Sequence, residues 1–383
     1  DGQDNNVQRF FEFQRGDPFK DKITIQGITF QSEFHNGDDQ GGNPGGSAGG
    51  GAILINMTTT ELVFDRIIFR NNVALQPYFH AGGGAVFISV KRGSISPKFI
   101  ECAFINNRIS NKDDNDESNA FGGAVAIEPG WDGYDGSPLD ESAVIFDRCY
   151  FEGNIAQHTS NNNYPSASGA AIDAMANIII RNSLFVNNKI TNSNNNNDSN
   201  NTIKLQPEYV DPGGNERVSG RALLINNTFY DNKTQKVVSL NGSSDYLNTH
   251  IYNNIFSEYK SVALELGSQV NLDSDHNLFD KNDGNYEGLN NNNVEGLQND
   301  IIAPPKFKNS STGDFRLSNN SPAVDGGAFS HDGYDELGNS NAPIVDIRGF
   351  YRVGVPDIGA YETGASKFLL ALKDNIDGDM DTT

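Results

Sequence analysis

Acidic side chains that precede a recurring phenylalanine are the first candidates for chemistry. Asp65, Glu101 and Asp147 each stand three or four residues before a phenylalanine of the same short motif. If the motif repeats in space, these carboxylates lie near one another, and paired carboxylates are the catalytic groups of glycoside hydrolases. Arg66 and Arg148 directly follow two of them, which favours instead an outward column of solvated, paired charges. The three carboxylates are candidate catalytic residues, and the solvated column is the alternative.

A polysaccharide lyase would need a base and a cation or arginine that neutralises a uronate group. The lysines and arginines are scattered along the chain, which carries no lyase motif, and its net charge of −22 opposes a polyanionic substrate. These observations disfavour a lyase.

Aromatic and imidazole side chains in loops are candidates for ligand binding. Trp131 and Tyr134 lie in a glycine-rich stretch and could offer flat apolar faces to sugar rings. His80, His158 and Tyr164 lie in segments that follow the repeated phenylalanine. We predict these five as binding residues. The alternative is that the rings fold back onto the protein and that the histidines are ordinary polar residues, since a metal site needs three or four converging ligands.

An acidic stretch near residue 380 suggests calcium. Its oxygen ligands would be Asp374, Asp377, Asp379 and Asp381, with Gly378 permitting a sharp turn. Hard cations prefer such oxygen clusters, and the spacing resembles thrombospondin type 3 and dockerin repeats without completing a loop. Calcium is therefore the one cofactor that the sequence suggests, and an acidic linker is the alternative.

Composition excludes several classes of protein. The 383 residues hold 50 acidic and 28 basic side chains, which argues against a nucleic-acid partner because phosphates attract clustered lysine and arginine. No run of 18 apolar residues occurs, so we expect no membrane-spanning helix. Two cysteines are too few for a disulfide framework or a cysteine-rich zinc site.

Two short repeats must position these side chains. One reads Phe-x-x-Asn after an apolar stretch, and it occurs at Phe69, Phe104, Phe151, Phe185 and Phe229. The other is a cluster of small residues followed by alternating apolar residues, and it occurs as GGAILI, GGAVFI, GGAVAI and SGAAI. Short β-branched runs between glycine and asparagine corners fit strands, which stack as the turns of a solenoid.

The position two residues before each phenylalanine predicts how the turns stack. It holds Asn in three successive repeats, at Asn227, Asn254 and Asn277. Amides in line along the axis form a hydrogen-bonded ladder. Cys102 and Cys149 occupy the same position in neighbouring repeats, so we expect them to be buried, adjacent and reduced.

These motifs resemble two bacterial elements. The GGA-[IV] and F-x-x-N units of residues 23–280 resemble those of chlamydial polymorphic outer-membrane proteins and related right-handed parallel β-helix proteins. The stretches GDFRLSNNSPAVDGG, DIRGF and VPDIGAYE resemble a choice-of-anchor element. The resemblance implies an all-β, right-handed parallel β-helix on the cell surface or outside the cell. It does not imply an activity, because this fold hosts lyases, hydrolases, adhesins and fibres.

We expect four regions along the chain. Residues 1–22 form a cap or an incomplete first turn, residues 23–280 the β-helix, residues 281–362 a C-terminal cap, and residues 363–383 an acidic tail or linker. Long insertions project from one side of the solenoid. They span residues 31–48, 73–81, 108–121, 155–167 and 189–219.

Two functions follow from this architecture. The leading hypothesis is a secreted or cell-surface protein that binds a glycan or a surface protein through its loops, or builds a structure, without chemistry of its own. The alternative is a carbohydrate-active enzyme, a polysaccharide lyase or glycoside hydrolase, that acts on extracellular polysaccharide.

Overall fold

The structure is a computed structural model. It describes residues 10–13, 22–32, 34–36, 48–56, 61–76, 80–90, 96–111, 119–129, 143–159, 166–192, 200–206, 208–210, 217–242, 247–281, 284–329 and 342–367. In this part of the chain the only helices are the 3-10 turns η1 (Leu289–Asn291) and η2 (Ser310–Thr312). None of them is long and apolar enough to cross a membrane.

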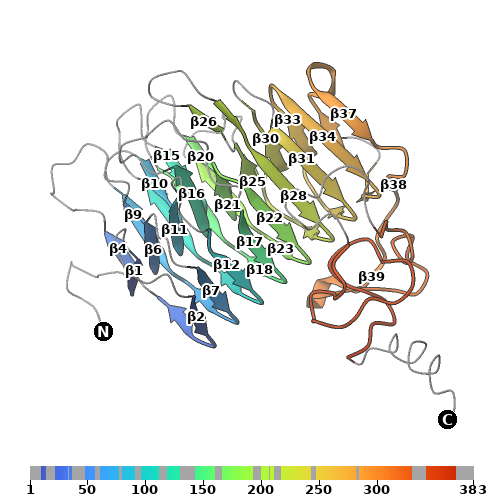
Figure 1. The fold of residues 1–383 in the computed structure, drawn as a ribbon, viewed down its shortest axis with the longest axis horizontal. Coiled ribbons are helices and arrows are strands. Elements are labelled where there is room, and N and C mark those ends of the chain that lie inside the picture. The colour runs from blue at the N-terminus through green and yellow to red at the C-terminus, as the bar shows by residue number, and fades with distance from the viewer. Residues whose placement is uncertain are drawn as a thin grey trace, which may run out of the picture.

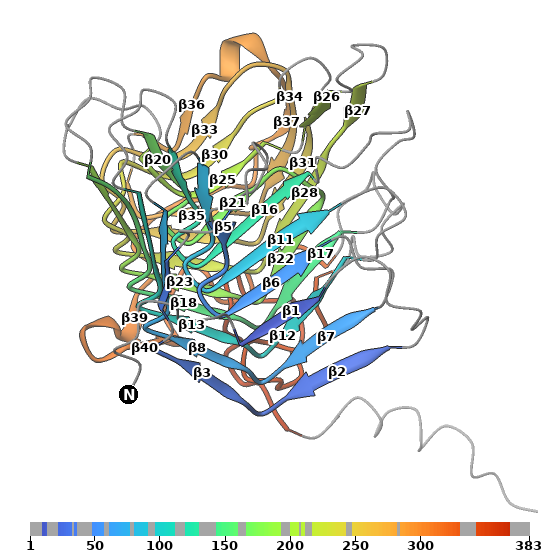
Figure 2. The same cartoon turned by 90° about the vertical axis from the view of Figure 1, so that its left-hand side faces the viewer.

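Three parallel sheets, each of nine strands, wrap around one axis (Figures 1 and 2). Sheet A stacks β1 (Phe11–Phe13), β6 (Ile53–Asn56), β11 (Val86–Val90), β16 (Val125–Pro129), β21 (Ile172–Ala174), β25 (Asn201–Leu205), β30 (Lys236–Leu240), β33 (Val262–Leu266) and β36 (Tyr286–Glu287). Sheet B stacks β2 (Ile23–Gln26), β7 (Leu62–Asp65), β12 (Lys98–Ile100), β17 (Val144–Asp147), β22 (Ile178–Arg181), β28 (Arg221–Ile225), β31 (Leu247–Tyr252), β34 (Val270–Asp275) and β37 (Asn293–Gly296). Sheet C stacks β3 (Thr29–Gln31), β8 (Ile68–Arg70), β13 (Ala103–Ile105), β18 (Tyr150–Glu152), β23 (Leu184–Val186), β29 (Thr228–Tyr230), β32 (Ile255–Ser257), β35 (Leu278–Phe279) and β38 (Ile301–Ile302). The predicted parallel β-helix is confirmed, and its right-handed sense stays a prediction.

Two smaller parallel sheets begin and end the insertions. Sheet D contains β4 (Phe34–Asn36), β9 (Val73–Gln76), β14 (Arg108–Asn111), β19 (Ile155–His158) and β24 (Lys189–Asn192). Sheet E contains β5 (Ala48–Gly49), β10 (His80–Gly82), β15 (Asn119–Phe121) and β20 (Ser166–Ser168). Because these segments stack from turn to turn, the first four predicted insertions begin and end at one common corner. The fifth, residues 189–219, was wrong as a single insertion, because it contains strand β25 of sheet A. Two antiparallel hairpins, β26 (Glu208–Val210) with β27 (Arg217–Ser219) and β39 (Phe307–Asn309) with β40 (Asp314–Leu317), complete the strands.

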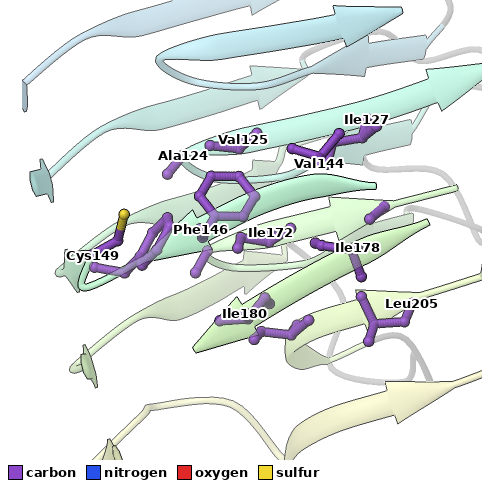
Figure 3. Close-up of a cluster of buried hydrophobic side chains, with 14 of the residues drawn as sticks. Ala124, Val125, Ile127, Val144, Phe146, Cys149, Ile172, Ile178, Ile180 and Leu205 are labelled. Atoms are coloured by element: carbon purple, nitrogen blue, oxygen red, sulfur yellow. The ribbon is translucent and has the colours of Figure 1, made fainter. Parts of the chain in front are cut away.

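Aromatic rings fill the core as a continuous stack. The motif phenylalanines from Phe30 to Phe279 stack with ring centroids 4.6–5.4 Å apart. A second stack runs through Phe64, Phe99 and Phe146. Aliphatic side chains from sheets A and B fill the rest of the interior, as Figure 3 shows around Phe146. The stacked rings favour parallel, in-register turns, since each aligned aromatic pair contributes about 0.5–1.5 kcal/mol beyond its burial.

At each corner the chain turns at a residue with left-handed backbone conformation. Arg66, Glu101 and Arg148 have positive φ between sheets B and C, and Asn71 and Asn106 have it after sheet C. The small-residue clusters form the corner that precedes each strand of sheet A. At Gly83 (φ 67°) an added Cβ would lie 2.0 Å from the carbonyl oxygen of Val86, and at Gly84 it would lie 2.2 Å from that of Gly123. Only glycine fits the first position, because it combines positive φ with backbone contact.

The predicted asparagine ladder is confirmed. The backbone N–H and the Nδ2 of Asn227 both donate to Oδ1 of Asn254, at 2.9 and 3.0 Å, and Asn254 donates to Asn277 in the same way at 3.0 and 3.1 Å. All three are fully buried. The ladder extends to Ser183 on one side, and it ends at Asp300, which accepts from the backbone of Asn277. A carboxylate suits the end because it only accepts hydrogen bonds.

A second ladder consists of the asparagines of the F-x-x-N motif. In each pair Nδ2 donates to Oδ1 of the next turn at 2.9–3.1 Å. Its members are Asn72, Asn107, Asn154, Asn188 and Asn232. The pattern predicted these asparagines at the corners as turn formers, whereas the residue with left-handed backbone is the one that precedes each of them.

The prediction for the two cysteines is confirmed. Cys102 and Cys149 are buried and free, and they directly precede Ala103 and Tyr150, which pair between β13 and β18. Burial raises the pKa of the Cys149 thiol above its usual range, and contact with Cys102 adds to this effect. Both thiols therefore act as small apolar core groups.

Strands outside residues 23–280 pair with both ends of the coil. Strand β1 lies within residues 1–22 and pairs with β6. Strands β36, β37 and β38 add a turn after residue 280. The expected C-terminal cap was residues 281–362. Residues 303–329 and 342–367 pack along the side of sheet C, where they cover Ile255 and Leu278 on its outer face. We call these residues the side strap; they lie below the last turns in Figure 1.

The side strap docks on the corner between sheets B and C. Arg352 donates to Oδ1 of Asn182 at 2.9 Å, and Asn226 donates to the Asp357 carbonyl at 2.9 Å. Asn253 exchanges two hydrogen bonds of 2.8 Å with the backbone of Ala328. The corner position is charged in the earlier turns, at Arg66, Glu101 and Arg148, and becomes asparagine where the strap docks.

Replacing Asn254 by leucine tests the first ladder. We expect Asn254→Leu to lower the free energy of unfolding by about 1–3 kcal/mol, because it leaves the buried backbone N–H of Asn227 without its acceptor and removes the side-chain hydrogen bonds to Asn227 and Asn277. Urea denaturation measures this change. Asn293→Leu, at an exposed amide, is the control and should change stability little. Equal unfolding midpoints for the two variants would contradict the role of the ladder.

Candidate functional site

The predicted catalytic carboxylates lie on the outer wall as members of ion pairs. Asp65 Oδ2 is 3.1 Å from the Arg66 guanidinium. Asp147 Oδ2 lies 3.3 Å from Arg148 and 3.2 Å from Arg181. Glu101 Oε1 is 3.1 Å from Arg148. The arrangement matches the column of paired charges that the sequence analysis gave as the alternative.

Strand register separates Asp65 from Asp147, whereas Glu101 and Asp147 share the Arg148 side chain. Ile100 of β12 pairs with Asp65 on one side and with Asp147 on the other, so the apolar side chain stands between them in the column. Glu101 belongs to the adjacent corner, where it has positive φ. The structure therefore does not bring the three carboxylates together around one reacting bond.

The other predicted site residues divide into two groups. His158 ends β19 and is buried, in register with Asn111 of β14. His80 begins β10. The remaining predicted residues lie outside the described part of the chain: Trp131, Tyr134, Tyr164, Asp374, Asp377, Asp379 and Asp381. Among the described residues, no group of three or more His, Cys, Asp or Glu side chains could hold a metal ion.

A groove of about 660 Å³ lies on the outer face of sheet B, over its last three strands β31, β34 and β37. Strand alternation creates it: Leu247, Thr249 and Ile251 face the core, and the residues between them face outward. We call it the sheet B groove. Its outward side chains are Asn248, His250, Asn271, Asp273, Asn293 and Glu295.

One column of the groove is a chain of amides. Asn271 Nδ2 donates to Oδ1 of Asn248 at 2.8 Å, and Asn293 Nδ2 donates to Oδ1 of Asn271 at 2.8 Å. These asparagines are partly exposed in β31 and β34 and exposed in β37, unlike those of the core ladders. The hydrogen bonds orient a row of amide groups toward solvent at the spacing of the strands.

The second column carries an imidazole and two carboxylates. His250 Nδ1 lies 3.3 Å from Asp273 Oδ2, and Glu295 follows on the next turn. The His250 and Asp273 side chains contact each other and are 17% and 19% exposed, so solvent reaches both. The column can accept hydrogen bonds from a polyhydroxylated ligand, and a histidine held by a carboxylate can also take up a proton.

Sequence reasoning missed this groove, although a signal was present. Asn248 and His250 precede Phe256 by the same eight and six residues as Asn271 and Asp273 precede Phe279. Equal offsets from a stacked phenylalanine place side chains in the same outward column. The spacing from the motif phenylalanine therefore predicts the groove residues on the outer face as it predicts the ladder residues in the core.

A buried carboxyl pair lies on the outer face of sheet A. Asp173 of β21 is 2% exposed and Glu128 of β16 is 9% exposed. Asp173 pairs in register with Ala126 of β16 and Lys204 of β25, and Ser168 Oγ donates a hydrogen bond to its carboxylate.

Burial perturbs both acids of this pair. Burial and the charge of Asp173 raise the pKa of Glu128 to about 7. Burial also raises the pKa of Asp173, against the opposing effects of Lys204 and Ser168. The pair therefore retains a proton near neutral pH.

Stability should depend on the protonation of Glu128. A carboxyl group whose pKa rises on folding stabilises the protein below its unfolded pKa, near 4.5, and this contribution is lost as pH rises through about 7. Glu128→Gln should therefore be more stable than the wild type at pH 8 by about 3 kcal/mol, at about 1.4 kcal/mol per pKa unit, and the difference should vanish near pH 4. Denaturation curves across this pH range measure it.

Glu295→Gln, at an exposed position, provides the matched control and should leave the pH profile unchanged. Parallel profiles for the wild type and Glu128→Gln would show that Glu128 is not perturbed.

No family model, curated protein or solved structure matches this chain. The likeness to polymorphic outer-membrane proteins and to a choice-of-anchor element thus remains an interpretation of the motifs, whereas the parallel β-helix rests on the register of its sheets.

Proposed function

We propose that this protein is a secreted or cell-surface β-helix that binds an extended neutral glycan in the sheet B groove. The observation that carries the proposal is the groove itself: two outward columns of polar side chains on three successive turns. The groove spans three successive strands of sheet B, so a chain-like ligand can contact several turns at once.

The chemistry of the columns fits hydroxyl groups. An amide both donates and accepts hydrogen bonds, and a carboxylate accepts them strongly from hydroxyls. The neighbouring acids Asp273 and Glu295, with a net charge of −22 for the chain, disfavour a polyanion. A neutral polyol is the class of ligand that satisfies these groups.

A carbohydrate-active enzyme is the second candidate, and one observation favours it. His250 is held by Asp273 beside Glu295 in an open groove. This pairing orients the imidazole as a general base requires, with a further carboxyl group one turn away. The ion-paired wall residues Asp65, Glu101 and Asp147 do not add to this candidate.

Substitutions in the middle turn of the groove test the binding proposal. The double variant Asn271→Ala/Asp273→Ala removes one amide and one carboxylate from the centre of both columns. We expect its affinity for soluble β-glucan, xylan or mannan, whichever the wild type binds, to fall by tenfold or more, since about 1.4 kcal/mol is lost per factor of ten. Affinity electrophoresis and calorimetry measure the change.

Thr24→Ala, on the outer face of the first turn of sheet B, is the matched control and should bind as the wild type does. Unchanged affinity in the double variant, or no binding of any of these glycans by the wild type, would refute the proposal. Release of reducing ends or unsaturated sugars that is lost in His250→Ala would support the enzyme instead.

A further inference from the structure

The two polar columns of the sheet B groove are straight and evenly spaced. Strands β31, β34 and β37 pair in parallel without a register shift, so Asn271 lies directly between Asn248 and Asn293 (Figure 1). Asp273 is the middle member of the second column in the same way. Neighbouring turns are about 4.8 Å apart, and the two columns are two residues, or about 6.6 Å, apart along each strand. The groove therefore repeats one arrangement of polar groups on three successive turns.

We propose that the groove binds a β-1,4-linked chain of neutral hexoses that lies parallel to the solenoid axis, with one sugar on each turn. This inference rests on the proposed glycan binding. It adds the linkage of the glycan, its direction on the protein and the number of sugars that the groove holds.

The spacing of the turns is the main reason for this choice of linkage. A β-1,4-linked hexose chain is extended and nearly straight, and each sugar advances it by close to the distance between neighbouring strands. Over three turns the small difference between the two repeats stays within the reach of the side chains. Glucans with α-1,4 or β-1,3 linkages coil, so their successive sugars leave a straight row of binding groups.

The amide column suits a chain whose sugars alternate in orientation. In an extended β-1,4-linked chain each hexose is turned over relative to the one before it, so one edge of the chain presents ring hydroxyls and hydroxymethyl groups in turn. Asn271 uses one N–H and one oxygen lone pair for its neighbours in the column, and an amide has two of each. It can therefore donate to one hydroxyl and accept from another, whichever edge of the sugar faces it.

The preceding turn marks where the row of binding groups begins. Arg221 and Leu223 of β28 occupy the positions that pair with Asn248 and His250. Leu223 is 7% exposed and belongs to a buried apolar cluster. Strand β37 is the last strand of sheet B in the described part of the chain. The two columns therefore offer positions for three sugars.

The size of the groove agrees with this number. Its volume of about 660 Å³ lies within the range of about 300–1,000 Å³ that is typical of sites for small ligands, and a trisaccharide is a ligand of this class.

Binding of matched trisaccharides to the full chain tests the linkage. The β-1,4-linked trisaccharide of glucose or of mannose should bind about tenfold or more tightly than the β-1,3-linked and α-1,4-linked trisaccharides of glucose, since hydrogen bonds are lost where a coiled chain leaves the row. Oligomers of the better β-1,4-linked sugar should gain affinity with each unit up to three. Longer oligomers should gain only through the number of ways in which three adjacent sugars can be chosen. Calorimetry and NMR titration measure these affinities.

Removing one amide at a time tests the register of one sugar on each turn. Asn271→Ala, in the middle turn, should weaken binding of both the disaccharide and the trisaccharide by about threefold to tenfold, the contribution of one hydrogen bond. Any two adjacent sugars must occupy that turn. Asn293→Ala, in the last turn, should weaken the trisaccharide to the same extent, whereas the disaccharide can still bind to the first two turns and should lose little affinity.

Asn319→Ala, at an exposed position of the side strap, is the matched control and should change neither affinity. Circular dichroism melting of each variant confirms the fold. A wild type that binds none of these sugars or their polymers would overturn the proposed function together with this inference. Equal affinities for the three linkages, or equal losses of disaccharide affinity in Asn293→Ala and Asn271→Ala, would overturn the register and the linkage while glycan binding stands.

Discussion

A buried amide that must bond to the turn above and the turn below is the interaction on which this molecule depends. Each ladder asparagine accepts from the turn before it and donates to the turn after it, so a turn that slips by one residue leaves several buried polar groups unpaired. The phenylalanine stacks add attraction along the axis and tolerate small displacements better than hydrogen bonds do. The ladders therefore fix the register, and the rings and aliphatic groups supply most of the burial.

Fixed register turns the outer surface into columns as well. Successive side chains of a strand point to opposite faces, so the residues that face the core determine those that face outward. Each outward position therefore recurs on every turn at the same number of residues from the motif phenylalanine. Paired charges occupy one such column at Asp65 and Asp147, and amides occupy another in the sheet B groove. The corner column changes from charged residues to asparagines where the side strap needs amide partners. The outer columns vary in residue type because the two core ladders do not include them.

The sequence therefore predicted the inside of this protein better than its outside. The phenylalanine spacing revealed the turns, the position of Asn254 and the burial of Cys149, because core positions repeat in residue type as well as in offset. The second ladder was missed because asparagine also suits turns, so its type alone did not separate the two roles. The groove and the Glu128–Asp173 pair depend on register between strands that variable insertions separate, and the side strap depends on contacts between residues more than 100 positions apart.

Accessible polar groups and perturbed acids lie in different places on this scaffold, and this separation bears on function. An acid–base enzyme needs a group with shifted acidity where substrate can reach it. Here the strongly shifted carboxyl of Glu128 is buried on sheet A, whereas the groups that solvent reaches line the groove on sheet B. A surface that offers many ordinary hydrogen-bonding groups in regular rows is suited to holding a ligand. This separation is the reason for ranking ligand binding ahead of acid–base catalysis in the proposed function.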